Sequence, residues 1–394
     1  MDIDQLGIET ARATPFGWSD EQQEIRSMLR RKFATLAAAE MARTALDSPA
    51  EGAAEQVAMW RALCSEIGLA GLTVPVELGG MGCGRIELAI VGEEMGRALI
   101  GGPYLSTIVL AAEAIVASED SEAAEELLPD IAEGSMTAAL AVCESSSAWT
   151  AATTTFTGGL VNGTKNGVIG AAGADHVVVS VLDEDGGGQS LVVVDAAAAG
   201  ATLVVTPAQP LDASRTVATV TFENTPGRRL GTAGAAGEIL ARVRETAAIF
   251  LAAEQAGGSR ACVELTAEYA RTRIQFGQQI GQFQGVKHRL ADMEVRTAQA
   301  HSASVWAAWA EPGSSDAALG AAVARVWCTE SYLQNAFDTI QLHGGIGITW
   351  EHDAHLFLRR AQADAVLLGS LAQERAVLAA RLVPGPGPQQ EESA

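Results

Sequence analysis

The spacing of apolar residues changes twice along this chain, and this change limits its possible folds more than any other feature. From residue 20 to about residue 133, apolar side chains recur three and four residues apart, as in DEQQEIRSMLRRKFATLAAAEMA, which predicts helices. From about residue 135 to 225 the pattern is alternating and β-branched, as in DHVVVSVL and RTVATVTFEN, which predicts short strands. Helical spacing returns at Gly237 and continues to about residue 382. This order predicts an α+β fold.

The same order predicts three folded parts and a tail. We expect an N-terminal helical domain over residues 1–134, a β-barrel or sandwich over 135–232, and a C-terminal helical domain over 233–384. Residues 385–394 carry nothing to bury, so we expect a disordered tail. The length of 394 residues and the 48% hydrophobic content are sufficient for a large core.

The charge balance is strongly acidic, which excludes some partners. With 48 acidic and 26 basic residues the formal net charge is -22, so nucleic acid would be repelled. Local arginines such as Arg271 and Arg273 can still hold a small anion, including a phosphorylated cofactor. No apolar run is long enough to span a membrane, and residues 1–18 lack the pattern of a secretory signal. We therefore expect a cytoplasmic protein.

Two motifs in the C-terminal part give the chain a family resemblance. RIQFGQQIGQFQGVKHRLADM occupies residues 273–293, and QLHGGIGITW occupies residues 341–350. Together with the loop PVELGGMGCGRIE near Pro75 and the order of helices and strands, they resemble the acyl-CoA dehydrogenase family. The resemblance covers most of the chain and implies a helical domain, a β domain and a C-terminal four-helix bundle. It also implies FAD, an acyl-CoA thioester substrate and an electron-transferring flavoprotein that accepts the electrons.

The resemblance also assigns a cofactor clamp. Arg273 would pair with the FAD pyrophosphate through its fixed donors, and Phe276 would pack on the adenosine end. Glycines would let backbone amides approach the ligand. Taken singly, each residue has a structural alternative, because arginine caps helices and glycine turns chains. The clamp, which in this family acts across a dimer interface, would comprise Arg273, Gln275, Phe276, Gln284, Gln341, Gly344 and Gly345.

The positions that carry the family's catalytic base are empty. Where the usual base precedes Gly-Thr, this chain has Leu368-Gly369-Ser370, and the second known position falls on Ala247. Glu245 and Glu254 lie within about two helical turns of Ala247 and would substitute if the helix were shifted. Glu254 lies in an apolar run that would raise its carboxyl pKa, as a general base requires. The alternative, which we favour, is a buried glutamate bonded to a neighbouring helix or lining the cofactor groove.

The positions that contact the flavin ring also depart from the family. The usual Thr-Glu-Pro loop is replaced by Cys143-Glu144-Ser145-Ser146-Ser147, and Val168-Ile169-Gly170 lacks the hydroxyl that lies near flavin N5. The clamp is therefore retained while the ring contacts and the base are lost. We expect no catalytic residue in this chain. We expect a degenerate small subunit that shares FAD with a catalytic subunit in an α2β2 assembly, as in actinobacterial enzymes for steroid side-chain CoA esters.

Two alternatives remain open. One is a self-sufficient homomeric dehydrogenase with Glu254 or Glu245 as its base, and the other is a flavin-free binding module of the same fold. The cluster His343, His352, Asp353 and His355 resembles the family's ordinary helix start, so no metal is expected. The glycines of GGMGCG follow no strand and open no βαβ unit, which excludes a Rossmann site.

Overall fold

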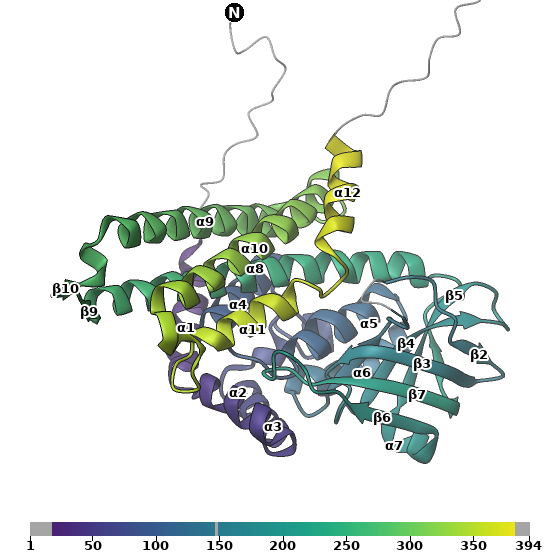
Figure 1. Cartoon of the computed structure of the whole chain (residues 1–394). Helices are drawn as coiled ribbons and strands as arrows, with labels where there is room; N and C mark the ends of the chain where they lie inside the picture. The colour runs from purple at the N-terminus through teal and green to yellow at the C-terminus, as the bar shows by residue number, and fades with distance from the viewer. Residues whose placement is uncertain (1–17, 146–148, 383–394) are drawn as a thin grey trace, which may run out of the picture.

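The structure is a computed structural model that describes residues 18–145 and 149–382 (Figure 1). The expected tail at residues 385–394, together with Ser146 and Ser147, lies outside these described residues. The N-terminal part is helical, as the sequence predicts. Its elements are α1 (Asp20–Phe33), α2 (Ala38–Asp47), α3 (Pro49–Ile67), η2 (Leu69–Gly71), η3 (Val76–Leu78), α4 (Arg85–Arg97), η4 (Leu105–Ala112), α5 (Glu113–Ala117) and α6 (Ser121–Glu133).

Local sequence explains where these helices begin and end. Ser19 caps α1 by accepting a hydrogen bond from the backbone N–H of Gln22, whose side chain accepts one from Ser19 in return. Pro49 opens α3, where its missing N–H costs nothing, and Gly68 ends that helix in a left-handed conformation with φ 64°. These local signals fix where α1 begins and where α3 begins and ends.

The β part is one sheet of eight strands, in which β1 pairs with β4 outside the order β6-β7-β3-β2-β4-β5-β8. Strands β4 and β5 are antiparallel from the pair His176 and Asp195 to the pair Leu182 and Gln189. Val178 faces the main core while its neighbours face a second core, so the centre of the sheet is buried on both sides. The strands are β1 (Ala138–Ala141), β2 (Thr155–Thr157), β3 (Leu160–Ile169), β4 (His176–Asp183), β5 (Gln189–Asp195), β6 (Leu203–Pro207), β7 (Val217–Pro226) and β8 (Arg228–Leu230), with α7 (Ala196–Ala199) and η5 (Gly200–Thr202) before β6.

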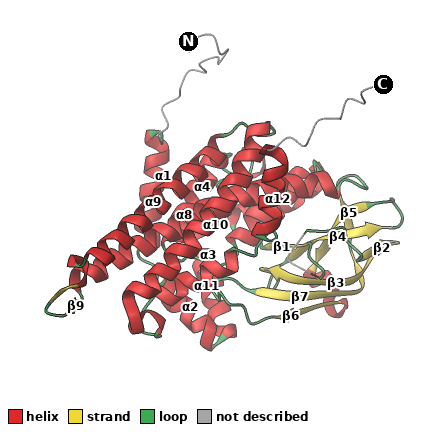
Figure 2. Cartoon of the chain, turned by 45° about the horizontal axis from the view of Figure 1, so that its top comes forward, coloured by secondary structure: helices red, strands yellow, loops and turns green. Residues whose placement is uncertain are grey.

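Long helices form the C-terminal part and lie side by side (Figure 2). Helix α8 packs closely on α4, because a Cβ added at Gly96 would lie 1.9 Å from the Glu254 carbonyl oxygen. A short hairpin joins α8 to α9 at the end of these helices that points away from the sheet (Figure 1). The elements are α8 (Ala236–Thr272), β9 (Ile274–Gln275), β10 (Gln278–Gln279), η6 (Ile280–Gln282), α9 (Gln284–Trp309), α10 (Ser315–His343), η7 (Gly344–Ile348), α11 (Ala354–Asp364) and α12 (Leu371–Leu382).

The predicted α+β fold of helices, a β domain and helices is confirmed by this arrangement. No helix within the described ranges has both the length and the apolar character needed to cross a membrane.

Candidate functional site

A cavity of about 810 Å³ lies where the helical parts meet the sheet. Its wall is mostly apolar and includes Leu105 from the N-terminal part, Val168 and Ile169 from β3, and Leu251 from α8. Leu368 also lines it, with φ 63°, a left-handed conformation that is unusual for leucine. Leu368, which the sequence resemblance aligns with the usual base, therefore lines this cavity with a side chain that cannot accept a proton.

Glu144 is a carboxylate on the cavity wall, and its position is fixed by hydrogen bonds. The Nζ of buried Lys165 lies 2.7 Å from Glu144 Oε1, and Thr153 and Thr154 donate through both backbone N–H and hydroxyl groups. Burial alone would raise the Glu144 pKa, but these hydrogen bonds outweigh it and lower the pKa to about 2. Asn166 also donates to the Glu144 carbonyl oxygen. Glu144 is therefore joined to β3 and to the residues that precede β2.

Asp212 is another carboxylate on this wall, and it is also paired. Its Oδ2 lies 2.6 Å from the Nε of buried Arg360. Burial alone would raise its pKa, but Arg360 and Arg215 outweigh burial and lower it. Within the part of the chain that the structure describes, both carboxylates at the cavity are therefore held as ion-paired or hydrogen-bonded anions. Neither is suited to take a proton from a substrate.

The two alternative bases lie away from this wall. Glu254 has 0% of its surface exposed, forms an ion pair with Arg215, and accepts a hydrogen bond from Arg360 Nη1 at 2.6 Å. Glu245 pairs with Arg85 at 2.6 Å. Neither glutamate lines the cavity. Both are bound to arginines and do not point at a ligand space.

Glu254 belongs to a buried ion cluster that our sequence analysis missed. Arg215 also pairs with Asp364 at 2.8 Å, so the cluster joins the loop after β6 to α8 and α11. Burial and the nearby Glu254 charge raise the Asp364 pKa to about 7. The Arg359-Arg360 pair was visible in the sequence, but nothing there indicated its distant partners. Because Arg215 and Asp212 also line the cavity, the cluster fixes one of its walls.

The first half of the predicted clamp lies in the hairpin at the far end of the C-terminal helices. Phe276 is 93% exposed at φ 52°, and its ring meets Phe283 edge-on at 6.1 Å. The exposed Arg273 side chain has no ion pair or hydrogen bond with any residue that the structure describes. Gln284, the first residue of α9, is exposed, and the Gln275 side chain bonds only the neighbouring Ile274 carbonyl among these residues.

The second half of the clamp lies at the end of α10. Gln341, Gly344 and Gly345 are exposed, and a Cβ at either glycine would meet nothing within 4 Å in the described chain. The two halves are brought together by stacking of Tyr269, near the end of α8, on His343, with ring centroids 4.4 Å apart. All seven clamp residues are thus exposed at helix ends away from the sheet. The open space at the two glycines is compatible with close approach by a ligand.

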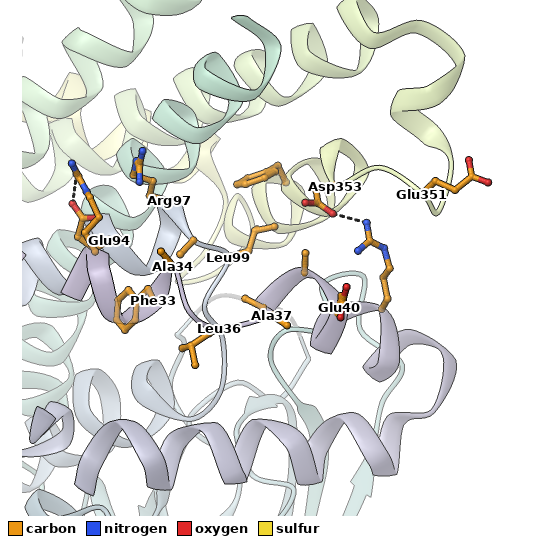
Figure 3. Close-up of a pocket in the computed structure, with 16 residues that line it drawn as sticks. Phe33, Ala34, Leu36, Ala37, Glu40, Glu94, Arg97, Leu99, Glu351 and Asp353 are labelled. Carbon is orange, nitrogen blue, oxygen red and sulfur yellow. Dashed lines mark hydrogen bonds and ion pairs between the residues drawn. The ribbon is translucent and has the colours of Figure 1, made fainter. Parts of the chain in front are cut away.

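A second cavity, of about 580 Å³, lies between α1, α2, the end of α4 and the start of α11 (Figure 3). Phe33 and Leu36 line it, and several of its charged groups are paired. Arg30 lies 2.6 Å from Glu94, for example. We call it the N-terminal cavity. Among the described residues, including those of this cavity, no group of three or more histidine, cysteine or acidic residues is arranged to hold a metal ion.

Comparison with known proteins supports the interpretation of the motifs. The family models for the acyl-CoA dehydrogenase N-terminal and C-terminal domains match residues 19–135 and 242–383. Acyl-CoA dehydrogenase IpdE2 from Mycobacterium tuberculosis is 34% identical over 88% of this chain and 94% of its own length. The solved Tcur3481–Tcur3483 steroid ACAD is 29% identical with a TM-score of 0.79, covering 92% of this chain and 97% of that chain. The ChsE4–ChsE5 complex from M. tuberculosis shares the fold: the matched chain has 24% identity and a TM-score of 0.78, covering 94% of this chain and 100% of that chain.

Proposed function

Because the chain belongs to the acyl-CoA dehydrogenase family, we propose that it is the degenerate subunit of a heteromeric FAD-dependent acyl-CoA dehydrogenase. In this role it holds the ADP half of an FAD whose flavin ring lies in a catalytic partner subunit. The partner supplies the base that takes the α proton of the acyl-CoA thioester. The chemistry supplied by bound FAD is acceptance of the β hydrogen as hydride.

The observation that carries this proposal is the separation of two features within one chain. The clamp residues are exposed and face away from the sheet, whereas the cavity in which a base would act is elsewhere and is lined by Leu368 at the base position. The carboxylates that face the cavity are already bonded. A chain with this arrangement can offer a nucleotide grip to a neighbour without performing dehydrogenation itself.

The clamp residues fit the ADP half of FAD in charge and shape. Arg273 has donors free for two phosphate groups, and its fixed planar geometry favours such anions. Phe276 presents a nearly bare ring on which an adenine can stack. Gly344 and Gly345 leave backbone amides accessible, and Gln275, Gln284 and Gln341 supply exposed side-chain amide groups.

The relatives suggest the wider context of the reaction. The steroid ACAD relative, at 29% identity, is a pair of different chains, which supports a heteromeric assembly and a steroid-derived acyl-CoA substrate. We propose α2β2 stoichiometry, electron transfer to an electron-transferring flavoprotein, and a cytoplasmic location. We also propose domain boundaries after residues 134 and 232, which limited proteolysis will test.

The experiment compares the chain purified alone with the chain co-expressed with a complete acyl-CoA dehydrogenase subunit. We expect the chain alone to lack flavin and the co-purified complex to contain FAD that acyl-CoA reduces. A homomeric, yellow protein whose flavin is reduced by acyl-CoA would instead establish the self-sufficient dehydrogenase with Glu254 or Glu245 as base. If no pairing ever contains FAD, the flavin-free binding module is correct.

A further inference from the structure

We propose that His343 and His352 are positioning residues that hold the clamp loop Gly344–Ile348 in place, and that they do so only as neutral imidazoles. The inference deepens the proposed function and rests on it, because the loop is one half of the clamp. It names the two side chains that fix the loop. It also predicts that FAD binding depends on pH, which would not be so if only apolar side chains held the loop.

His343 ends α10 directly before the loop and is only 4% exposed. Its Nδ1 lies 2.7 Å from the Thr339 carbonyl oxygen, which can only accept, so Nδ1 carries the proton of the neutral ring. Nε2 is then an unprotonated acceptor, and it is buried with no hydrogen-bond partner among the described residues. A second proton on this ring would place an N–H where nothing accepts it.

His352 holds the other end of the segment that contains the loop. Its Nδ1 accepts a hydrogen bond from the backbone N–H of Ala354, the first residue of α11, at 3.1 Å. The imidazole thus satisfies one of the free N–H groups at the start of α11. Protonation of Nδ1 would abolish this bond and set two N–H groups against each other. The neutral ring is therefore required for this hydrogen bond.

The two rings are also in contact. Their centroids are 4.4 Å apart at an interplanar angle of 54°. The Tyr269 ring of α8 stacks on His343 and meets His352 edge-on, with ring centroids 6.4 Å apart in the second contact. Two imidazolium ions at this separation would repel each other with little intervening solvent. Removal from water is the main cause that lowers the pKa of each histidine below its ordinary value. Both rings are consequently neutral at pH 7.

The charged groups around this pair act in both directions. Arg43 of α2, which lines the N-terminal cavity, donates to the Trp350 carbonyl oxygen at 2.8 Å and lies 2.5 Å from Asp353. Asp353 favours protonation of His352, but its charge is already paired with Arg43. On the α11 side, His355 packs edge-on against Trp350, and burial, followed by the Arg359 charge, lowers the pKa of His355. Removal of the two rings from water, more than any single nearby charge, therefore keeps them unprotonated.

The test measures FAD retention by the co-purified complex as pH falls from about 7.5 to about 5. We expect FAD to bind more weakly at the lower pH, by up to about tenfold for each pH unit below the pKa of a histidine that must be neutral. His352→Asn keeps a side-chain oxygen that accepts from Ala354 but does not titrate, so it should flatten the pH profile. His343→Phe keeps the ring stack on Tyr269 without a titrating group. His288→Asn, at an exposed histidine of α9, is the matched control and should behave like the unaltered chain.

Hydrogen exchange of residues 340–354 supplies a readout that does not depend on activity. After correction for the intrinsic pH dependence of exchange, this segment should lose protection in acid while the centre of α8 does not. The inference is overturned if the unaltered complex retains FAD equally well across the range. It is also overturned if the double variant His343→Phe/His352→Asn loses FAD in acid as the unaltered complex does. A complex without FAD at any pH would overturn the proposed function as well.

Discussion

Replacing Glu254 by glutamine tests whether this glutamate stabilises the fold or acts as the catalytic base. Glu254 is fully buried and contacts Arg215 and Arg360, so Glu254→Gln removes one negative charge between two buried arginines while keeping the side-chain size. If Glu254 were the base, this change would abolish dehydrogenation with little effect on stability. The buried position instead predicts a large loss of stability.

The size of that loss follows from the partners that remain. Breaking a buried ion pair by removing one partner costs about 3–5 kcal/mol. After the substitution Arg215 still pairs with Asp364 at 2.8 Å, and Arg360 still pairs with Asp212 at 2.6 Å. Because each arginine retains one carboxylate, we expect the free energy of unfolding to fall by about 3 kcal/mol, the lower end of that range.

Urea unfolding of the co-purified complex, followed by tryptophan fluorescence, measures this change. The matched control is Glu245→Gln, because that glutamate retains 20% of its side-chain exposure beside Arg85 and should cost no more than about 1 kcal/mol. The reasoning is refuted if Glu254→Gln leaves the unfolding midpoint unchanged and yet prevents flavin reduction by acyl-CoA.

Three further changes test other parts of the account. Gly96→Ala should destabilise the folded chain by about 3 kcal/mol or more, because its Cβ would lie 1.9 Å from a carbonyl oxygen of α8. The control is Gly237→Ala, whose Cβ would meet nothing within 4 Å and which should stabilise the chain by about 0.5–1 kcal/mol. Thermal unfolding compares the two variants. Phe276→Ala should change stability by less than about 0.5 kcal/mol but reduce FAD content, as measured by absorbance after gel filtration. Lys165→Met should raise the Glu144 pKa from about 2. The lowered pKa stabilises the fold above the ordinary value of 4.5, and this stability is lost as pH falls towards 2, so the variant should unfold at a higher pH in acid titration.

The helices, strands and family motifs were predictable because they depend on local spacing. Alternating β-branched residues indicated β4 and β5, and the three- and four-residue spacing indicated the helices on either side. The clamp motif was also recognisable, although burial rules would have placed the Phe276 ring inside the protein. Its 93% exposure runs against the general tendency of apolar residues and agrees with the contact to another molecule that we propose.

The ion cluster was not predictable, because its members meet only after the chain has folded. Arg215 and Asp364 are 149 residues apart, and Glu254 and Arg360 are 106 residues apart. No periodicity links a loop after β6 to the interior of α8 and α11. The sequence therefore suggested Glu254 as a possible base because it lies in an apolar run, whereas the folded chain surrounds it with arginines.

The FAD content of the co-purified complex tests the central claim most directly when Arg273 is changed in this chain only. Arg271, an exposed arginine two residues away that pairs with Glu268 at 3.5 Å, provides the matched control. We predict that Arg273→Ala leaves the complex assembled but largely empty of FAD, and that Arg271→Ala retains it. An assembled complex that keeps its full FAD content with Arg273→Ala would contradict the claim that this chain holds the nucleotide for its partner.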